Sequence, residues 1–322
     1  MRAFVTGGTG FIGRHLVSRL RARGDDVVAL VRSPARAEAL GDLGCELVTG
    51  DLDDAAVMQE AMEGCDAAFH GAAVYKIGVT EDECRDMHRT NVDGTATVFE
   101  ASAAAGVARV VYVSTVNCFG DTSGRVLDEE DARPSDRFLS CYDATKFRAH
   151  EIAAQHIAGG APIVIVQPGS VYGPGDHSQV GRMIADTVKG RTKLMLFPEL
   201  GLTLVHVEDV ADGIVAAHDK GRTGQSYVLG GHIGTMGELV RRVAELSGRT
   251  PPKHSLPTSV VRASLPLAPL ISRAMGLPSN LRELVTASDG VTYWARDDKA
   301  RRELGYAPRD LDTGLRQTLQ DR

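Results

Sequence analysis

Tyr142 and Lys146 are the residues of this chain whose types and spacing point most directly to chemistry. On a helix, residues four apart lie on one face, about 5 to 6 Å apart at Cβ. An ammonium group in that position stabilises a neighbouring phenolate, so we expect Lys146 to lower the pKa of Tyr142. Such a tyrosine can donate a proton to a carbonyl oxygen as a hydride arrives, or accept one from an alcohol. The alternative is that the pair lies on a solvated helix face.

A glycine cluster near the start of the chain stands between an apolar run and a helix-patterned segment. Gly7 permits a tight turn, Gly10 allows the backbone to approach phosphate oxygens, and Gly13 allows the helix to pack closely on a sheet. A second apolar segment, 27–31, arrives about 20 residues later. This order of elements binds a dinucleotide pyrophosphate on the free N–H groups at the helix start. The alternative is a glycine-rich turn with no ligand.

Strand and helix patterns alternate through the first half of the chain. The predicted strands are the run around Val5 and segments 27–31, 46–49, 67–70, 109–114 and 163–167. The predicted helices begin after the glycine cluster and continue at 38–40, 55–62, 83–105, 144–157, 238–246, 260–265, 280–287 and 298–304. Apolar strands separated by helices indicate an α/β fold with a doubly wound parallel (Rossmann) sheet. We expect a dinucleotide-binding domain over 1–168, a mainly substrate-binding lobe over 169–322, and a return of 204–230 to the first domain.

Composition narrows the class of protein further. The 322 residues carry a net charge of −6 with interspersed signs, which predicts neither nucleic acid nor an anionic membrane as a partner. Because the N-terminus passes directly into a strand pattern, no secretory signal is evident, and we expect a cytoplasmic protein. The five cysteines are odd in number and scattered, without a Cys-x-x-Cys pair. This pattern predicts reduced thiols, with neither a disulfide framework nor a metal site.

Several segments, taken in order, resemble one known family. They are Thr6-Gly-Gly-Thr-Gly-Phe-Ile-Gly13, Gly50-Asp-Leu52, His70-Gly-Ala-Ala73, Asn91-Val-Asp-Gly-Thr95, Ser114-Thr115, Tyr142-Asp-Ala-Thr-Lys146, Pro168-Gly-Ser-Val-Tyr-Gly-Pro-Gly175, Leu204-Val-His-Val-Glu-Asp-Val-Ala211 and Lys299-Ala-Arg-Arg-Glu-Leu-Gly-Tyr306. Together they resemble the extended short-chain dehydrogenases/reductases, also called the NAD-dependent epimerase/dehydratase family. The likeness covers nearly the whole chain, and it is strongest to the dihydroflavonol-reductase-like and hopanoid-associated branches.

The resemblance implies roles for particular residues. Thr115 matches the residue that hydrogen-bonds the reacting oxygen beside the tyrosine, and Asn91 matches an asparagine that braces the site. Thr115 could instead serve the strand end, and Asn91 could bond helix backbone. The cofactor-binding candidates are Gly7, Thr9, Gly10, Phe11, Ile12, Gly13, Arg32, Arg36, Asp51, Leu52, Ala72, Ala73, Tyr142, Lys146, Pro168 and Val171. The substrate-binding candidates are Thr115, Asn117 and Ser170.

The end of the second predicted strand bears on the choice of cofactor. An NAD enzyme usually has an acidic residue there for the ribose hydroxyls, whereas NADP needs a cation for its 2′-phosphate. This chain has Arg32 at that point and Arg36 shortly after it. Guanidinium groups bind phosphate bidentately, so we expect NADP(H) as the preferred cofactor, with NAD(H) as the alternative. Arg32 could otherwise be a solvated surface arginine.

Two departures from the family pattern bear on the substrate. Nucleotide-sugar enzymes of the family have Asn and Arg where this chain has Ser170 and Leu202, and the sugar dehydratases have an Asp-Glu pair where it has Val116 and Asn117. A buried diphosphate without a cation is strongly unfavourable, so these departures disfavour nucleotide sugars. The apolar run 260–275 could line a pocket for a hydrophobic carbonyl compound, or could be ordinary core.

The sequence thus predicts an NADP(H)-dependent oxidoreductase that interconverts a ketone or aldehyde and its alcohol. A sugar or nucleotide-sugar epimerase using the same residues is the first alternative. A protein that binds the dinucleotide as a signal without turnover is the second. The family likeness and the two long alanine-rich helices, 83–105 and 144–157, also predict a homodimer.

Overall fold

A seven-stranded parallel sheet forms the centre of the molecule. The computed structural model describes residues 1–256, 258–267 and 280–320. The strands are β1 (Arg2–Thr6), β2 (Asp26–Val31), β3 (Glu46–Thr49), β4 (Ala67–His70), β5 (Arg109–Val113), β6 (Ile163–Pro168) and β9 (Ser226–Leu229). Their order is β3-β2-β1-β4-β5-β6-β9, and every neighbouring pair is parallel. All four side chains of β4 are buried, as in a sheet covered on both faces.

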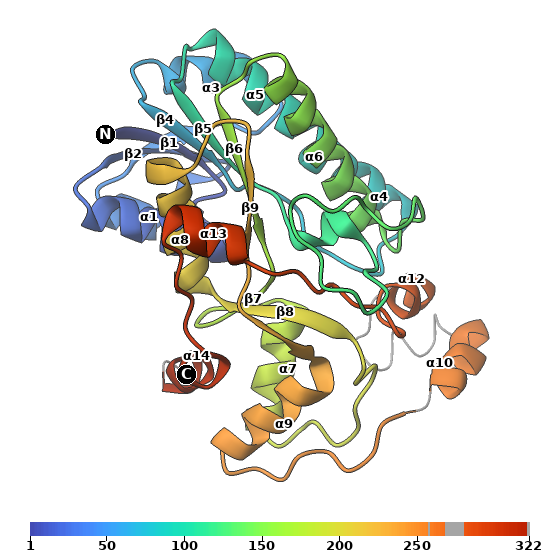
Figure 1. Cartoon of the computed structure of the whole chain (residues 1–322). Coiled ribbons are helices and arrows are strands. Elements are labelled where there is room, and N and C mark those ends of the chain that lie inside the picture. The colour runs from blue at the N-terminus through green and yellow to red at the C-terminus, as the bar shows by residue number, and fades with distance from the viewer. Residues whose placement is uncertain (257, 268–279, 321–322) are drawn as a thin grey trace.

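Helices cover both faces of this sheet (Figure 1). One face carries α1 (Phe11–Ala22), α8 (Val207–Lys220) and α13 (Asp298–Leu304), whose leucines, valines and alanines share one apolar cluster with the strands. The other face carries α3 (Ala55–Met62), α5 (Gly94–Ala104) and α6 (Cys141–Ala158), which share a second cluster. A short turn, η1 (Pro34–Arg36), and α2 (Glu38–Asp42) join β2 to β3. The prediction of a doubly wound α/β fold is therefore confirmed.

The helix predicted over 83–105 differs from the observed one in two ways. It begins earlier, as α4 (Glu81–His88), because Thr80 and Glu83 cap each other's backbone N–H groups. It is then interrupted by a π-helical segment, η2 (Arg89–Asp93), before α5 begins. Asn91 lies in this segment, and its side-chain amide bonds the backbone of Val74 outside the helix. A π-helical segment inside a longer helix is frequently found at a functional site.

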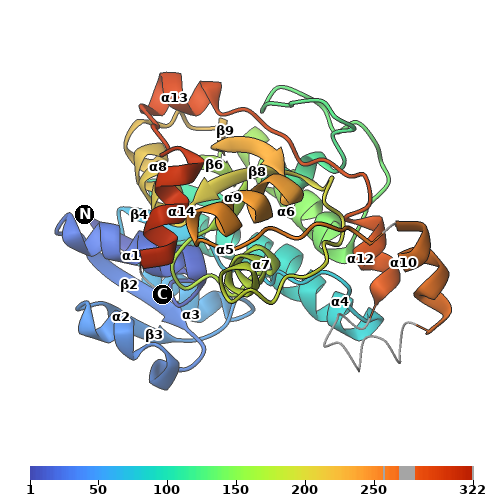
Figure 2. The ribbon, with the colours of Figure 1, turned by 90° about the horizontal axis from the view of Figure 1, so that it is seen from below.

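A smaller sheet organises the second half of the chain. It contains β7 (Ser170–Tyr172), β8 (Gly201–His206) and β10 (His232–Thr235) in the order β10-β8-β7. The helices around it are α7 (Gln179–Val188), α9 (Met236–Leu246), α10 (Thr258–Ser264), η4 (Leu265–Leu267), α12 (Leu281–Thr286) and α14 (Leu311–Gln320). Within 204–230, the end of β8 belongs to this small sheet, whereas α8 and β9 pack on or join the large one. Figure 2 shows α10 and α12 at the edge of the molecule next to α4.

Two of the five cysteines form a disulfide, contrary to the prediction of reduced thiols. Cys84 on α4 and Cys141 at the start of α6 are bonded, with their Cα atoms 5.8 Å apart. Helices α4 and α6 lie side by side, which brings together two residues separated by 57 positions in the sequence. Cys45, Cys65 and Cys118 are free. Across the ranges that the structure describes, we find no helix with the length and apolar character needed to cross a bilayer.

Candidate active site and cofactor groove

The glycine turn between β1 and α1 has the shape expected of a phosphate-binding loop. Gly7 has φ +76°, and a Cβ atom on it would lie 2.6 Å from the backbone nitrogen of Ala72. A Cβ atom on Gly13 would overlap the carbonyl oxygen of Gly7. Gly13 therefore brings α1 against the turn itself, rather than against the sheet as predicted. Gly10 caps α1 without a side-chain hydrogen bond, so the helix start fits an anionic group.

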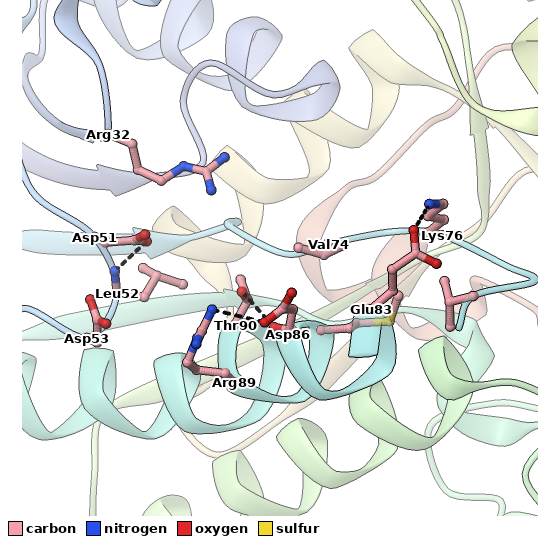
Figure 3. Close-up of a pocket in the computed structure, with 12 residues that line it drawn as sticks. Arg32, Asp51, Leu52, Asp53, Val74, Lys76, Glu83, Asp86, Arg89 and Thr90 are labelled. Atoms are coloured by element: carbon pink, nitrogen blue, oxygen red, sulfur yellow. Dashed lines mark hydrogen bonds and ion pairs between the residues drawn. The ribbon is translucent and has the colours of Figure 1, made fainter. Parts of the chain in front are cut away.

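A cavity of about 560 Å³ lies beside the ends of β2 and β3 (Figure 3). Arg32 follows β2, and Asp51 and Leu52 follow β3, and all three line the cavity. Arg89 also lines it, with one guanidinium nitrogen 3.1 Å from Asp86 Oδ1. The other lining residues are Asp53, Val74, Lys76, Val79, Glu83, Met87 and Thr90. Three of the predicted cofactor-binding residues thus line one cavity.

Arg36, the second predicted cation, lies on η1. It is exposed, as Arg32 also is, but unlike Arg32 it is not among the residues that line the cavity. Of the two arginines, Arg32 is therefore the better candidate for contact with the 2′-phosphate group of a bound cofactor.

Tyr142 and Lys146 both lie in the first half of α6 with buried side chains. The ammonium nitrogen of Lys146 donates to the hydroxyl of Tyr112 at 3.1 Å and to the carbonyl oxygen of Val113 at 3.0 Å. Burial lowers the pKa of Lys146 to about 8. These two acceptors lie on β5, so the lysine is anchored to the sheet.

The predicted lowering of the Tyr142 pKa is wrong for this structure. Burial raises the pKa of Tyr142 above its ordinary value, and the neighbouring Tyr75 raises it further. Hydrogen bonding with the Thr115 side chain acts in the opposite direction. The spacing rule placed the ammonium on the right helix face, but it could not show that the surrounding apolar side chains remove the phenol from water.

Thr115 follows β5 by two residues and caps the short helix η3 (Val116–Phe119). Its hydroxyl lies 3.2 Å from Asn117 Oδ1 and 3.5 Å from the carbonyl oxygen of Pro168. Ser114 points to a different partner, the imidazole of His150 at 3.0 Å. Thr115 thus lies close to Asn117 on η3 and to Pro168 at the end of β6, two residues that were also predicted to contribute to the site.

Asn91 holds a loop in place. Its Oδ1 accepts from the backbone nitrogen of Val74 at 2.7 Å, and its Nδ2 donates to the carbonyl oxygen of Val74 at 3.0 Å and to Thr145 Oγ1 at 3.2 Å. The alternative of a bond to its own helix backbone is not what the structure shows. Asn91 instead connects the loop after β4 to α6.

Behind the candidate residues lies a buried chain of hydrogen bonds. The His70 ring bonds Thr6 Oγ1 at 2.7 Å and Thr95 Oγ1 at 2.9 Å. Burial, together with the charge on Lys146, lowers the pKa of His70 to about 3, so the ring is neutral at ordinary pH. Thr6 also accepts from the backbone nitrogen of Ala72, which fixes the loop that faces the glycine turn.

Further predicted residues lie on β7 in the second half of the chain and in the loop after β4. Ser170 and Val171 lie on β7 and are half-buried, and Ala72 is half-buried while Ala73 is exposed in the loop after β4. Leu202 on β8 is 5% exposed and belongs to the apolar cluster of the second lobe. Part of the predicted apolar run 260–275 lies outside the described residues; within them, Val261 and Leu265 pack against the same cluster.

Sequence reasoning missed several residues that contact the candidate site. The ring of Tyr75 packs edge to face on Tyr142. Asp143, next to Tyr142, forms a buried ion pair with Arg133. The carboxylate of Glu283 on α12 accepts from the backbone nitrogens of Cys141 and Val79. Asp143 stood inside a recognised motif and could have been suspected, but no local pattern marks Tyr75, Arg133 or Glu283.

Comparison with known proteins agrees with this geometry. The sequence pattern of the NAD dependent epimerase/dehydratase family matches residues 3–230. The chain is 36% identical to the 4-hydroxy-2-methyl-3-oxo-4-farnesyl-3,4-dihydroquinoline-1-oxide ketoreductase of Stigmatella aurantiaca, over 96% of this chain and 92% of that protein. It is 30% identical to a 3 beta-hydroxysteroid dehydrogenase/Delta 5-->4-isomerase of Mycobacterium tuberculosis, over 95% of this chain and 86% of that protein.

A solved structure shares the fold over the full chain. DesIV, a dTDP-glucose 4,6-dehydratase from Streptomyces venezuelae determined with NAD and TYD bound, superposes with a TM-score of 0.79. It is 26% identical to this chain, and the likeness covers 100% of this chain and 96% of that one. The chain therefore belongs to the NAD dependent epimerase/dehydratase family, the extended short-chain dehydrogenases/reductases, and is an NAD(P)-dependent oxidoreductase of that type.

Proposed function

We propose that this enzyme interconverts a hydrophobic ketone or aldehyde and its alcohol, with NADP(H) as the preferred cofactor. The observation that carries the proposal is the convergence of Tyr142, Lys146 and Thr115 at the carboxyl end of β5, where parallel sheets receive ligands. Two relatives with reductase or dehydrogenase names, the ketoreductase and the hydroxysteroid dehydrogenase, support a net redox reaction.

Each of the three side chains has a definite task in this reaction. A bound nicotinamide cofactor supplies the hydride. Tyr142 donates a proton to the carbonyl oxygen, and in the reverse direction it accepts one from the alcohol. The positive charge of Lys146 favours the phenolate that forms, because it reduces the cost of a negative charge in a buried site. The Thr115 hydroxyl hydrogen-bonds the reacting oxygen and holds it next to Tyr142.

The proposed preference for a hydrophobic substrate depends on two apolar side chains, Leu202 and Val116. They stand where nucleotide-sugar enzymes of the family have charged residues. Leu202 is buried among apolar neighbours, and Val116 is 1% exposed on η3. Neither residue can offset a buried diphosphate, whose uncompensated charge would be costly. A carbonyl compound with an apolar body carries no such charge. The two named relatives, whose substrates include a farnesyl quinoline and a steroid, support the same class.

The test follows the absorbance of the reduced cofactor with a panel of hydrophobic ketones and aldehydes. The proposal expects consumption of NADPH with at least one compound, and a fall in turnover of roughly 10²- to 10⁴-fold for Tyr142→Phe. The titrated affinity for NADPH should remain close to that of the unchanged enzyme, because the substitution removes only a hydroxyl. Conversion of a sugar without net change in absorbance would favour an epimerase. Cofactor binding with neither outcome would favour a sensor.

A further inference from the structure

Tyr75 places an exposed aromatic surface directly beside the candidate proton donor. Its ring centroid lies 4.7 Å from that of Tyr142, with the two planes at 85°. Tyr75 is 51% exposed, whereas Tyr142 is 9% exposed. An aromatic side chain that packs on one buried ring and leaves half of its surface open can accept a second flat group on its free surface.

The backbone on both sides of Tyr75 is tied to other elements. Asn91 accepts from and donates to the main chain of Val74, as described above. Glu283 accepts from the backbone nitrogen of Val79 at 3.0 Å, and Lys76 pairs with Glu83 on α4. Because the loop is held before and after Tyr75, the ring position is set in advance of binding. Little ordering entropy then opposes a ligand that packs on it.

Two apolar residues lie close to Tyr75 in the sequence, while the charges of Asp176 and Arg182 act on its hydroxyl. Ile77 is partly buried, and it packs both on the cluster that contains Tyr142 and on the apolar cluster of the second lobe. Met183 and Leu139 are further partly buried residues that pack on the apolar cluster of the second lobe. Val74 is 37% exposed and lines the cavity of Figure 3. The loop that carries Tyr75 therefore contributes apolar side chains to both lobes, through Ile77, and to the cavity, through Val74.

We propose that Tyr75 determines substrate specificity by stacking on a flat, apolar ring carried by the carbonyl substrate, next to the carbonyl group that Tyr142 protonates. This inference rests on the proposed function and narrows its substrate class to ring-bearing ketones. Aromatic packing against a preformed ring favours such a substrate by about 10-fold over a ring-free ketone of equal hydrophobicity. The hydroxyl of Tyr75 plays no part, since the ring supplies the contact.

The experiment compares two ketones of matched hydrophobicity, a bicyclic aryl ketone and an acyclic alkyl ketone, across Tyr75→Ala and Tyr75→Phe. We expect Tyr75→Ala to lower kcat/KM for the aryl ketone about 10-fold, mainly through KM, and to change that for the alkyl ketone less than about 3-fold. Tyr75→Phe should retain the ratio of the two. Leu43→Ala is the control, because Leu43 is a 40% exposed apolar residue between α2 and β3.

Asn91→Ala is a second test, since it releases the backbone of Val74 and so loosens the position of the Tyr75 ring without removing it. It should reduce the preference for the aryl ketone, and adding Tyr75→Ala to it should reduce that preference little further. A loss shared equally by both ketones in Tyr75→Ala, or an unchanged ratio, would overturn the assignment of Tyr75. If Tyr142→Phe retained full turnover in the same assay, the proposed function itself would fail, and the two failures are thus distinguishable.

Discussion

The carboxylate of Asp143 receives two hydrogen bonds from the guanidinium group of Arg133, each at 2.8 Å, and the two side chains are only 0% and 7% exposed. Asp143 directly follows Tyr142 on α6. Arg133 also donates to the carbonyl oxygen of Cys118, on the short helix that Thr115 caps. One buried ion pair therefore connects the segments that carry the candidate proton donor and the candidate hydroxyl group.

Arg133→Ala should strongly destabilise the protein. The substitution leaves the Asp143 carboxylate buried without its cation, and removal of one partner from a buried pair costs about 3 to 5 kcal/mol. The free energy of unfolding in urea measures this loss. Arg125→Ala is the matched control, because Arg125 pairs with Asp131 at 3.5 Å with its side chain 62% exposed. Exposed pairs contribute about 0 to 1 kcal/mol, so equal losses in the two variants would contradict the prediction.

The buried ammonium of Lys146 predicts a pH dependence of turnover. Burial lowers its pKa from 10.5 to about 8, so the group loses its positive charge as the pH rises through about 8. Without that charge the Tyr142 phenolate is less favoured, and carbonyl reduction should slow. We expect kcat, measured with saturating cofactor, to fall above about pH 8. A rate that stays constant up to pH 10 would show that the charge on Lys146 does not assist the reaction.

The disulfide between Cys84 and Cys141 predicts a stability that depends on reduction. Closing a loop whose ends are 57 positions apart lowers the entropy of the unfolded chain, which stabilises the folded state by about 4 kcal/mol in the loop-entropy treatment. Dithiothreitol should therefore lower the Tm of the unchanged protein. Cys84→Ser should lower it similarly and abolish the response to dithiothreitol. Cys45→Ser is the control, since Cys45 is a free thiol. An identical Tm with and without reductant would contradict the prediction.

The sequence predicted the parts of the fold that depend on local pattern. The segments 27–31 and 46–49 were found as strands β2 and β3 within one residue of their ends. Strand β2 is buried along 27–31, as expected of a nearly continuous apolar run, whereas β3 lies at the sheet edge and is only partly buried. The glycine turn was placed correctly, since its conformation leaves no room for side chains at Gly7 and Gly13.

The features that the sequence did not predict all depend on contacts between distant segments. Nothing near Cys84 indicates that it will meet Cys141, and nothing near Glu283 indicates that it will bond the start of α6. The pKa of Tyr142 is a further example. The four-residue spacing to Lys146 can be read from the sequence, but the burial that raises the pKa of Tyr142 comes from the packing of distant segments. The π-helical segment at Asn91 likewise reflects a contact outside the helix.

In the proposed function, Arg32 decides the choice between the two nicotinamide cofactors. It lines the cavity together with Asp51 at the ends of β2 and β3. A guanidinium group that binds the 2′-phosphate of NADP contributes charge-assisted hydrogen bonds of about 1.5 to 3 kcal/mol, which correspond to roughly 10- to 150-fold in affinity. The cofactor without this phosphate does not form them. The unchanged enzyme should therefore prefer NADPH.

Arg32→Asp should reverse this preference, because a carboxylate repels the 2′-phosphate and accepts hydrogen bonds from the ribose hydroxyls of NADH. The measurement is kcat/KM for both reduced cofactors at one ionic strength, since salt screens a partly exposed pair. Arg36→Asp is the matched control: it makes the same change of charge on the neighbouring turn, and Arg36 is not among the residues lining the cavity, so it should alter the ratio far less. A larger effect of Arg36→Asp, or an unchanged enzyme that uses NADH better than NADPH, would contradict the assignment of Arg32 while leaving the roles of Tyr142 and Lys146 intact.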